Sequence, residues 1–503
     1  MIAKSIKTSN DISILTEIIY CLESSTIHGV AKLIRARNFF IRFLWFQLLI
    51  CSSFCCVYLI KGTILDYLSF NVITKIRIQN EHSFKFPTIT ICNKNTFTSD
   101  ESVNYLNNLA KENNFSYFNN TSLNFTKYML REDLSSSLPI NLKDFFNIAK
   151  SNIIMKNFTN QQKENLSLPI NEFILFCRFV GQKCDLKNDF ESIFISQYGN
   201  CFSFNTKANN TKKILTRPGE INGFKFELYV GVPDEISQKA TERGAIIFIN
   251  VSSNFDLYQI SVEPGRETII GLKKYVTELL PYPYSDCIDL VENENKNDLI
   301  GIIKRNNLTY SQELCKSLCF QKYLNMVCNC FENFNNEIDY FFDVETKRIC
   351  FSKNDLKCLR DFYLRNFTRN NFIQQKCKCS IECEKISHER LITYSKYPTK
   401  IITDSIRYDK ILEKSVITKQ GDFKNDLENN LVRVNIYFDS LSYVHIKEYP
   451  GMNEIGLISS IGGTLGLFLG MSLLSLTESV ELLLSILISI FKKIKNKSQI
   501  SNI

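Results

Sequence analysis

Two long uncharged stretches constrain this chain more than any other feature. Residues 43–60 include eighteen positions without a charge, and residues 456–477 include twenty-two, with apolar character resuming as far as Phe491. A helix of about twenty apolar residues spans the hydrocarbon core of a bilayer. We therefore predict two membrane-spanning helices, over residues 43–61 and 455–491. This prediction excludes a soluble cytosolic enzyme.

The positive charges gather at the two ends of the chain. Residues 1–42 carry six Lys or Arg against three acids, and residues 492–503 carry four Lys and no acid. These two tails hold seven of the eight net positive charges. Since Lys and Arg are retained on the cytoplasmic side, we predict that both tails are cytoplasmic and that residues 62–454 are extracellular. The first span lies too far along the chain for a cleaved signal peptide and is expected to be a signal anchor.

The extracellular segment is close to neutral, so its charge gives no reason to expect a nucleic-acid partner. It holds fourteen of the eighteen cysteines, an even number that predicts seven disulfides in an oxidising compartment. Their pairing stays open, because fourteen cysteines allow about 135,000 arrangements. Zinc is the alternative for Cys328-x-Cys330 and Cys377-x-Cys379, but these are not the usual Cys-x₂₋₄-Cys spacings, and we predict no metal. The segment also has ten glycosylation sequons, some of which an Asn-rich chain supplies by chance.

Between the spans, the apolar pattern predicts a mixed ectodomain. Strand character is expected in three segments: 75–91, 221–270 and 391–448. The first and last of these adjoin the two spans and could share a sheet. Residues 93–175 are rich in Asn and Ser and predict short helices and loops, while Cys315 and Cys319 lie on one face of a predicted helix.

The second span has an unusual face of small residues. Ser459, Gly463, Gly466 and Gly470 recur at steps of four, three and four, with Ser460, Gly462 and Ser472 beside them. The simplest interpretation is a close helix–helix contact of the kind common in membranes.

Two further facts favour a cation pore instead. Glu478 and Glu481 lie within the apolar run, where a carboxylate costs about 2.5–3.5 kcal/mol unless it faces water or a partner. As one helix, residues 455–491 would be roughly 55 Å long, against a hydrocarbon core of about 30 Å. The helix must therefore tilt, project or break, and Gly470 is the natural place for a break. Small residues expose backbone carbonyls to an ion and carboxylates concentrate cations, so several subunits would have to surround one axis.

Four blocks of sequence are specific enough to compare with known families. Residues 25–29 are Ser-Thr-Ile-His-Gly, and residues 86–93 are Phe-Pro-Thr-Ile-Thr-Ile-Cys-Asn. Residues 462–472 contain Gly-Gly-x-x-Gly-Leu-Phe-x-Gly-x-Ser, and the fourth block is the cysteine series from Cys315 to Cys383. In this order the blocks resemble the degenerin/epithelial sodium channel family, which includes the acid-sensing and peptide-gated channels.

The resemblance implies an α+β membrane protein that assembles as a trimer. Two transmembrane helices would flank a large disulfide-rich ectodomain with a β palm and β-ball, a knuckle, and a helical finger and thumb. The finger would occupy about 95–175, the part too divergent to place, and the thumb about 285–383. The protein would be a multi-pass protein of the plasma membrane.

The resemblance also implies how the outer cysteines pair. The pairs are Cys92–Cys201, Cys177–Cys184, Cys287–Cys383, Cys315–Cys379, Cys319–Cys377, Cys328–Cys358 and Cys330–Cys350. The last five are nested, which is the order that an antiparallel helical hairpin would impose.

Site residues follow from the resemblance in the same way. Gly470, Met471 and Ser472 would form the selectivity filter. Ser459 matches the position where bulky residues hold family channels open, and Ser460, Gly463, Gly466 and Glu478 would line the pore. His28 and Gly29 match the gating motif, and Tyr284 the aromatic that couples thumb to first span. Without the resemblance, Ser459 would be interpreted as a helix-packing serine and His28-Gly29 as a turn in the tail. Tyr284 would be interpreted as an ordinary buried ring.

We therefore expect a subunit of an amiloride-sensitive, sodium-selective cation channel, either homo- or heterotrimeric, with Na⁺ as permeant ion and no cofactor.

Met471 stands where the family usually has a small residue, which puts selectivity over K⁺ in question. The chain has four histidines, none in residues 69–75 where acid sensors carry one. It also lacks the Pro-Pro-x-Tyr and Arg-x-x-Arg motifs of epithelial subunits. A peptide ligand is therefore favoured as stimulus over protons or force.

Three other classes compete. An ATP-gated trimer should show clustered Lys and Gly for the phosphates, and no such cluster is evident outside. A two-span scavenger or adhesion receptor without a pore is the main alternative, and it predicts no function for the glycine face. A membrane-anchored enzyme is disfavoured because no catalytic constellation can be singled out.

Overall fold

The computed structural model describes most of the chain. The described residues are 23, 29–112, 142–156, 158–195, 197–206, 213–231, 242–250, 259–288, 299–306, 308–332, 348–350, 352–364, 376–402, 428–472 and ten residues between 474 and 488. They fall into two compact units. The terminal unit combines residues 1–74 with residues 448–503, and the central unit is residues 75–447.

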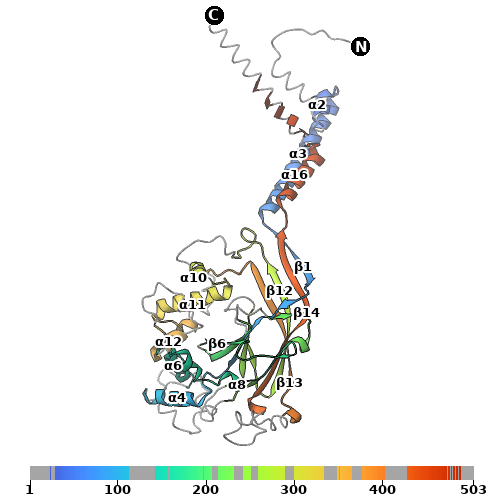
Figure 1. The fold of residues 1–503 in the computed structure, drawn as a ribbon. Coiled ribbons are helices and arrows are strands. Elements are labelled where there is room, and N and C mark those ends of the chain that lie inside the picture. Colours follow the sequence, from blue (N-terminus) through green and yellow to red (C-terminus); the bar gives the residue numbers. More distant parts are fainter. Residues whose placement is uncertain are drawn as a thin grey trace. The chain divides into compact units, whose positions relative to one another are not determined.

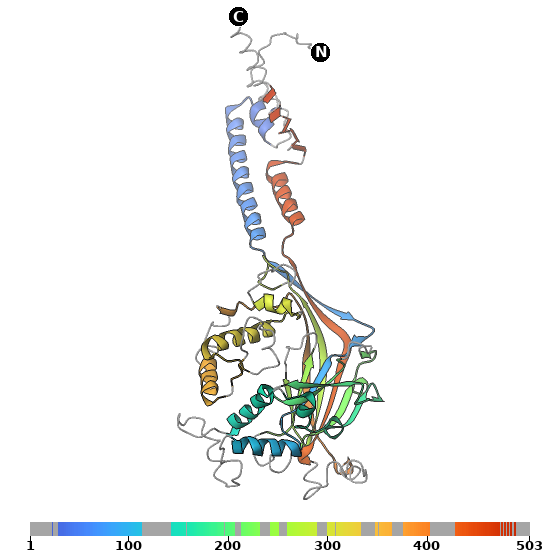
Figure 2. The same cartoon turned by 60° about the vertical axis from the view of Figure 1, so that its left-hand side comes forward.

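The terminal unit is built from helices (Figure 1). These are α2 (Val30–Arg35), α3 (Phe39–Leu68) and α16 (Glu454–Leu469). Among the described residues, α3 is the one helix long and apolar enough to cross a membrane, and α16 is a shorter apolar helix. The two lie side by side (Figure 2).

Helix α3 extends beyond the predicted 43–61 at both ends. It has 30 residues, or about 45 Å at 1.5 Å per residue, which is longer than the hydrocarbon core of about 30 Å. Charged residues such as Arg42 and Lys61 end an apolar run without ending a helix, so hydropathy located the apolar part of α3 and missed its outer turns.

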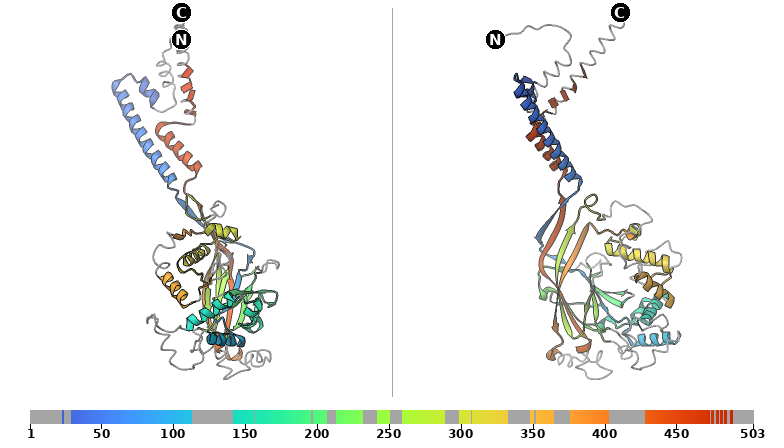
Figure 3. Two further views of the ribbon diagram at one scale, coloured as in Figure 1. Left: turned by 90° about the vertical axis from the view of Figure 1, so that its left-hand side faces the viewer. Right: turned by 180° about the vertical axis from the view of Figure 1, so that it is seen from behind.

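The central unit contains two main sheets (Figure 3). The first has the strand order β13-β12-β14-β9-β4-β5, with β1 paired to β14. Its strands are β1 (Val72–Asn80), β4 (Ile174–Phe179), β5 (Gln182–Lys183), β9 (Phe224–Tyr229), β12 (Arg266–Glu278), β13 (Glu384–Lys396) and β14 (Leu431–Pro450). The prediction that the strands next to the two spans share a sheet is therefore confirmed.

The second sheet has the order β11-β10-β3-β7-β6. Its strands are β3 (Thr88–Asn93), β6 (Phe190–Ile195), β7 (Gly199–Phe204), β10 (Ala245–Asn250) and β11 (Gln259–Val262). A short pair, β2 (Phe84–Lys85) with β8 (Ile214–Leu215), completes the β structure of the described residues.

A phenylalanine-rich core joins the two sheets. Phe204 of β7 stacks on Phe224 of β9 with ring centroids 4.0 Å apart and planes 13° apart. Both side chains are fully buried. Phe86, Phe179 and Phe190 pack edge-on or tilted around them. Because the stacked rings come from different sheets, this aromatic cluster holds the sheets face to face.

Helices lie along one side of the strands (Figures 1 and 3). The helices are α4 (Asp100–Glu112), α6 (Leu142–Met155), α7 (Asn160–Glu164), α8 (Ile170–Phe173), α10 (Leu299–Arg305), α11 (Gln312–Cys328) and α12 (Lys353–Phe362). α4 and α6 share an apolar cluster around Leu106 and Ile153. They lie within the segment where short helices and loops were expected.

Seven disulfides connect the cysteines of the central unit. They are Cys92–Cys201, Cys177–Cys184, Cys287–Cys383, Cys315–Cys379, Cys319–Cys377, Cys328–Cys358 and Cys330–Cys350. These are the same pairs that the family resemblance implies. The cysteines considered for zinc are each half of a disulfide, so their thiolates are not free to bind a metal.

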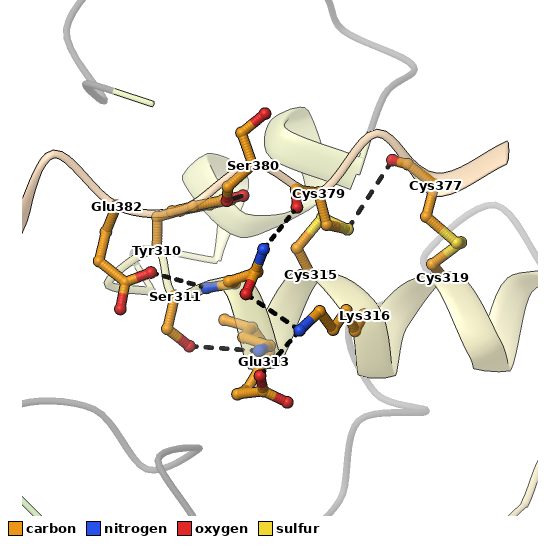
Figure 4. The surroundings of a disulfide bond; sticks show 12 residues. Tyr310, Ser311, Glu313, Cys315, Lys316, Cys319, Cys377, Cys379, Ser380 and Glu382 are labelled. Atoms are coloured by element: carbon orange, nitrogen blue, oxygen red, sulfur yellow. Dashed lines mark hydrogen bonds and ion pairs between the residues drawn. A yellow bond between two sulfur atoms is a disulfide. The ribbon is translucent and has the colours of Figure 1, made fainter. Parts of the chain in front are cut away.

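Hydrogen bonds reinforce the disulfides at the start of α11 (Figure 4). Tyr310 donates from its hydroxyl to the carbonyl of Ser380 at 2.6 Å. Gln312 donates its side-chain amide to the Cys379 carbonyl and its backbone N–H to a Glu382 oxygen. Residues 377–382 are thus held along α11 by two disulfides and three hydrogen bonds, which makes this part of the unit rigid.

We predict that Phe204→Ala destabilises the central unit by about 3–5 kcal/mol, because a large cavity would open between the sheets. Ile221→Ala is the matched control, since Ile221 is 87% exposed. The thermal unfolding midpoint of the protein in detergent measures both. Equal midpoints for the two variants would contradict the assignment of Phe204 to the core.

Candidate functional site

Helix α16 stops inside the second apolar segment, at Gly470. This residue has φ 68° and ψ 17°, the left-handed conformation that glycine adopts without a side-chain penalty. Gly470 donates its backbone N–H to the Gly466 carbonyl at 3.0 Å, and Met471 donates to the Leu465 carbonyl at 3.3 Å. Of the three outcomes that the length of the apolar run allowed, the structure shows a break, and it lies at Gly470, the residue named for it.

Beyond the break, two serines begin a new helical turn. Ser472 donates its backbone N–H to the Ser475 hydroxyl at 3.1 Å, and Ser475 donates its own N–H to the Ser472 hydroxyl at 3.3 Å. This reciprocal pair resembles a capping box, which satisfies the free amides at a helix start. Ser475 is fully buried. The interruption thus has a helix cap on each side.

Among the described residues, none covers the glycine face of α16. A Cβ built on Gly462 or Gly463 would meet nothing within 4 Å, and one on Gly466 would reach only the Met471 carbonyl at 3.6 Å. Ser459 and Ser460 are also exposed. Several of the predicted pore residues therefore share one open helical face that leads to the Gly470 turn.

The other predicted site residues lie outside the open face of α16. Glu478 lies in the helical turn after the break. Gly29 precedes α2 with φ 88°, and a Cβ there would lie 3.0 Å from the Leu49 side chain of α3. His28 lies outside the described residues. Tyr284 is half-buried in the turn after β12, in the central unit, and its coupling to the first span stays a prediction.

Charged side chains cluster near the ends of β12 and β14. Glu278 accepts from Lys447 at 2.5 Å, and its second oxygen lies 2.9 Å from Nε2 of His445. The Lys447 bond is the main cause that lowers the pKa of Glu278, with His445 adding to it. Gln79 of β1 lies 3.5 Å from the other ring nitrogen of His445. The cluster therefore ties together all three neighbouring strands of the sheet.

A second histidine of the sheet is held neutral. Burial is the main cause that lowers the pKa of His388 to about 4, and the charges of Lys274 and Arg390 lower it further. Its Nδ1 is sealed from solvent with no hydrogen-bond partner among the described residues. His388 is thus uncharged at neutral and mildly acidic pH.

Sequence reasoning missed two serines near the break. Ser52 of α3 donates its hydroxyl to the Phe468 carbonyl of α16, a bond between residues 416 positions apart. Ser475 caps the turn that follows Ser472. The spacing of Ser472 and Ser475 signals a cap, whereas nothing in the sequence signals the partner of Ser52.

Known proteins resemble this chain over most of its length. A family model described as amiloride-sensitive sodium channel matches residues 21–482. Degenerin deg-1 of Caenorhabditis elegans is 28% identical over 362 residues, which cover 70% of this chain and 44% of that protein. The FMRFamide-activated amiloride-sensitive sodium channel of Cornu aspersum is 21% identical over 540 aligned positions, covering 92% of this chain and 81% of the relative.

The epithelial sodium channel subunit beta of Homo sapiens is 25% identical over 373 residues, covering 72% of this chain and 54% of the relative. The matches therefore span about half the length of deg-1 and of this human subunit. A solved proton-activated chloride channel aligns over 88% of this chain and 96% of its own, with 7% identity and a TM-score of 0.30. That likeness is too low to support a conclusion about fold.

We predict that Gly470→Ala destabilises the terminal unit by about 1–2 kcal/mol, because a Cβ is strained in the left-handed conformation. Gly470→Asn should cost less, since Asn tolerates this conformation. Gly462→Ala is the control, as Gly462 is helical with open space around it. Thermal unfolding midpoints in detergent rank the stabilities of the three variants. A Gly470→Ala protein as stable as Gly470→Asn would contradict the left-handed conformation assigned to Gly470.

We also predict that His388 makes the central unit sensitive to acid. Its pKa of about 4 in the folded protein lies below the ordinary 6.5, so the unfolded chain binds more protons between these values. The stability that His388 provides is present above pH 6.5 and is lost as the pH falls towards 4, by at most about 3 kcal/mol. His388→Gln should flatten the fall of the unfolding midpoint between pH 7 and 4.

His82→Gln is the matched control for this pH series, because His82 is an exposed histidine of the same unit. An unfolding midpoint that depends on pH equally in His388→Gln and His82→Gln would show that His388 is not the source.

Proposed function

This chain belongs to the amiloride-sensitive sodium channel family, and on that premise we propose that it is a subunit of a trimeric, sodium-selective cation channel of the plasma membrane. The family consists of ion channels, so the chain is not an enzyme. The proposed subunit crosses the membrane twice with both tails in the cytoplasm. It assembles with two copies of itself or with other subunits of the family.

The single observation that supports the pore most directly is the broken helix α16. Its serine and glycine face meets no other described part of the chain and ends at the left-handed Gly470. A face without side chains brings backbone oxygens close to a central axis, where they can replace water around a cation. One helix cannot enclose such an axis. An assembly of three would line it with Ser459, Gly463 and Gly466 from each subunit.

In this proposal Gly470, Met471 and Ser472 form the narrowest part of the pathway. The Gly470 turn redirects the backbone: Gly470 makes the last i to i−4 bond of α16, to Gly466, and the amides of Met471 and Ser472 bond outside the helical pattern. In the proposed pore, the carbonyl oxygens of these residues face the ion. Glu478 lies beyond the turn and adds negative charge that raises the local cation concentration. His28 and Gly29 act at the cytoplasmic side of the gate, and Tyr284 couples the thumb to the first span.

We favour an extracellular peptide as the stimulus. One relative that spans most of this chain is an FMRFamide-activated channel. Protons have a weaker case, because burial keeps His388 neutral down to a pH of about 4. Other relatives are named acid-sensing ion channels, so protons remain the second candidate.

We predict that Ser459→Phe opens the channel without its stimulus, because a bulky ring on the open face of α16 would keep the subunits apart. Cells that express this variant should carry an inward current that amiloride blocks and that disappears when a large impermeant cation replaces external Na⁺. Whole-cell recording measures both effects. Ser459→Ala is the matched control and should stay closed, because it adds no bulk.

Surface biotinylation must accompany these recordings, because the currents of two variants can be compared only when equal amounts of each protein reach the cell surface. A Ser459→Phe protein that reaches the surface and carries no cation current, alone or with family subunits, would favour the receptor without a pore.

A further inference from the structure

Helix α16 ends inside an apolar segment, and the end of a helix leaves backbone carbonyls without helical partners. Two carbonyls near this end, those of Leu465 and Gly466, accept bonds from the residues of the turn. The Phe468 carbonyl, two residues before Gly470, accepts from the Ser52 hydroxyl of α3. A polar group left unpaired in hydrocarbon costs several kcal/mol, so this bond stabilises the broken helix.

The Ser52 bond differs from the bonds of two other hydroxyls in these apolar helices, because its acceptor belongs to the neighbouring helix. Such hydroxyls usually donate to a carbonyl four residues earlier in their own helix. Thr63 of α3 does this at 3.0 Å to Leu59, and Thr464 of α16 does it at 2.8 Å to Ser460. Ser52 donates instead to the neighbouring helix. It lies thirteen residues into α3, or about 20 Å from the start of that helix.

We propose that Ser52 is a positioning residue for ion selection. Its hydroxyl holds the Phe468 carbonyl and so fixes the angle at which the turn from Gly470 to Ser472 leaves α16. The turn is then secured by its own helix, by the Ser475 cap, and by α3. This inference rests on the proposed channel function and adds a residue of the first span to the apparatus that selects Na⁺.

The expected consequence is a change of selectivity with conduction retained. Discrimination between Na⁺ and K⁺ depends on the number and placement of the oxygens around the ion. Losing the Ser52 bond would leave the pathway open and let the end of α16 shift, so that the oxygens of the turn adapt to either ion. A residue that only supported folding would lower the number of channels and leave their selectivity unchanged.

The test compares Ser52→Thr with Ser52→Val in the Ser459→Phe background, so that no stimulus is needed. The two side chains have nearly the same shape, and only threonine keeps the hydroxyl. Ser53→Val is the matched control, because Ser53 is the neighbouring serine on α3 and is exposed. The readout is the reversal potential with Na⁺ outside and K⁺ inside, at equal surface expression.

Ser52→Val should lower the Na⁺ to K⁺ permeability ratio about two- to tenfold, as expected for the loss of one hydrogen bond. A tenfold fall shifts the reversal potential by about 59 mV. Ser52→Thr and Ser53→Val should keep the ratio of the parent.

Three results would overturn it: equal ratios in the Thr and Val variants, an equal shift in Ser53→Val, or silence in Ser52→Val at equal surface expression while the parent conducts. Silence of the parent itself is a different result. It would remove the proposed channel function, and this inference with it.

Discussion

A helix that stops within a membrane must find partners for the backbone groups that it no longer pairs, because hydrocarbon offers none. The second apolar segment of this chain meets that requirement locally. Gly470 turns the backbone into the left-handed region, and amides of the turn bond back to carbonyls of α16. Ser472 and Ser475 cap the start of the next turn. The amides at this break are therefore paired within the second apolar segment itself.

In the central unit, two sheets and a set of helices must be held together. Stacked phenylalanines from both sheets fill the space between them, and seven disulfides connect segments that lie up to 109 residues apart. The disulfides and hydrogen bonds at α11 make that region rigid.

Much of this organisation could be predicted from the sequence, because it depends on local pattern. Runs of apolar, β-forming residues located strands such as β9 and β10. The glycine spacing, together with the length of the apolar run, located the turn at Gly470. The disulfide pairing came from the family resemblance, since pattern alone cannot choose among so many arrangements. The ends of α3 were missed, because charged residues interrupt hydropathy without interrupting a helix.

Amino-acid order specifies the composition of each segment: which stretches are apolar, where glycine allows a reversal, and which serines can cap their own neighbours. Contacts between distant segments are decided by packing. Ser52 and Phe468 meet only because α3 and α16 lie side by side, and His388 loses its charge only because β12 and β13 bury it beside Lys274. A side chain's chemistry is local, whereas its partner and its exposure to water depend on the whole fold.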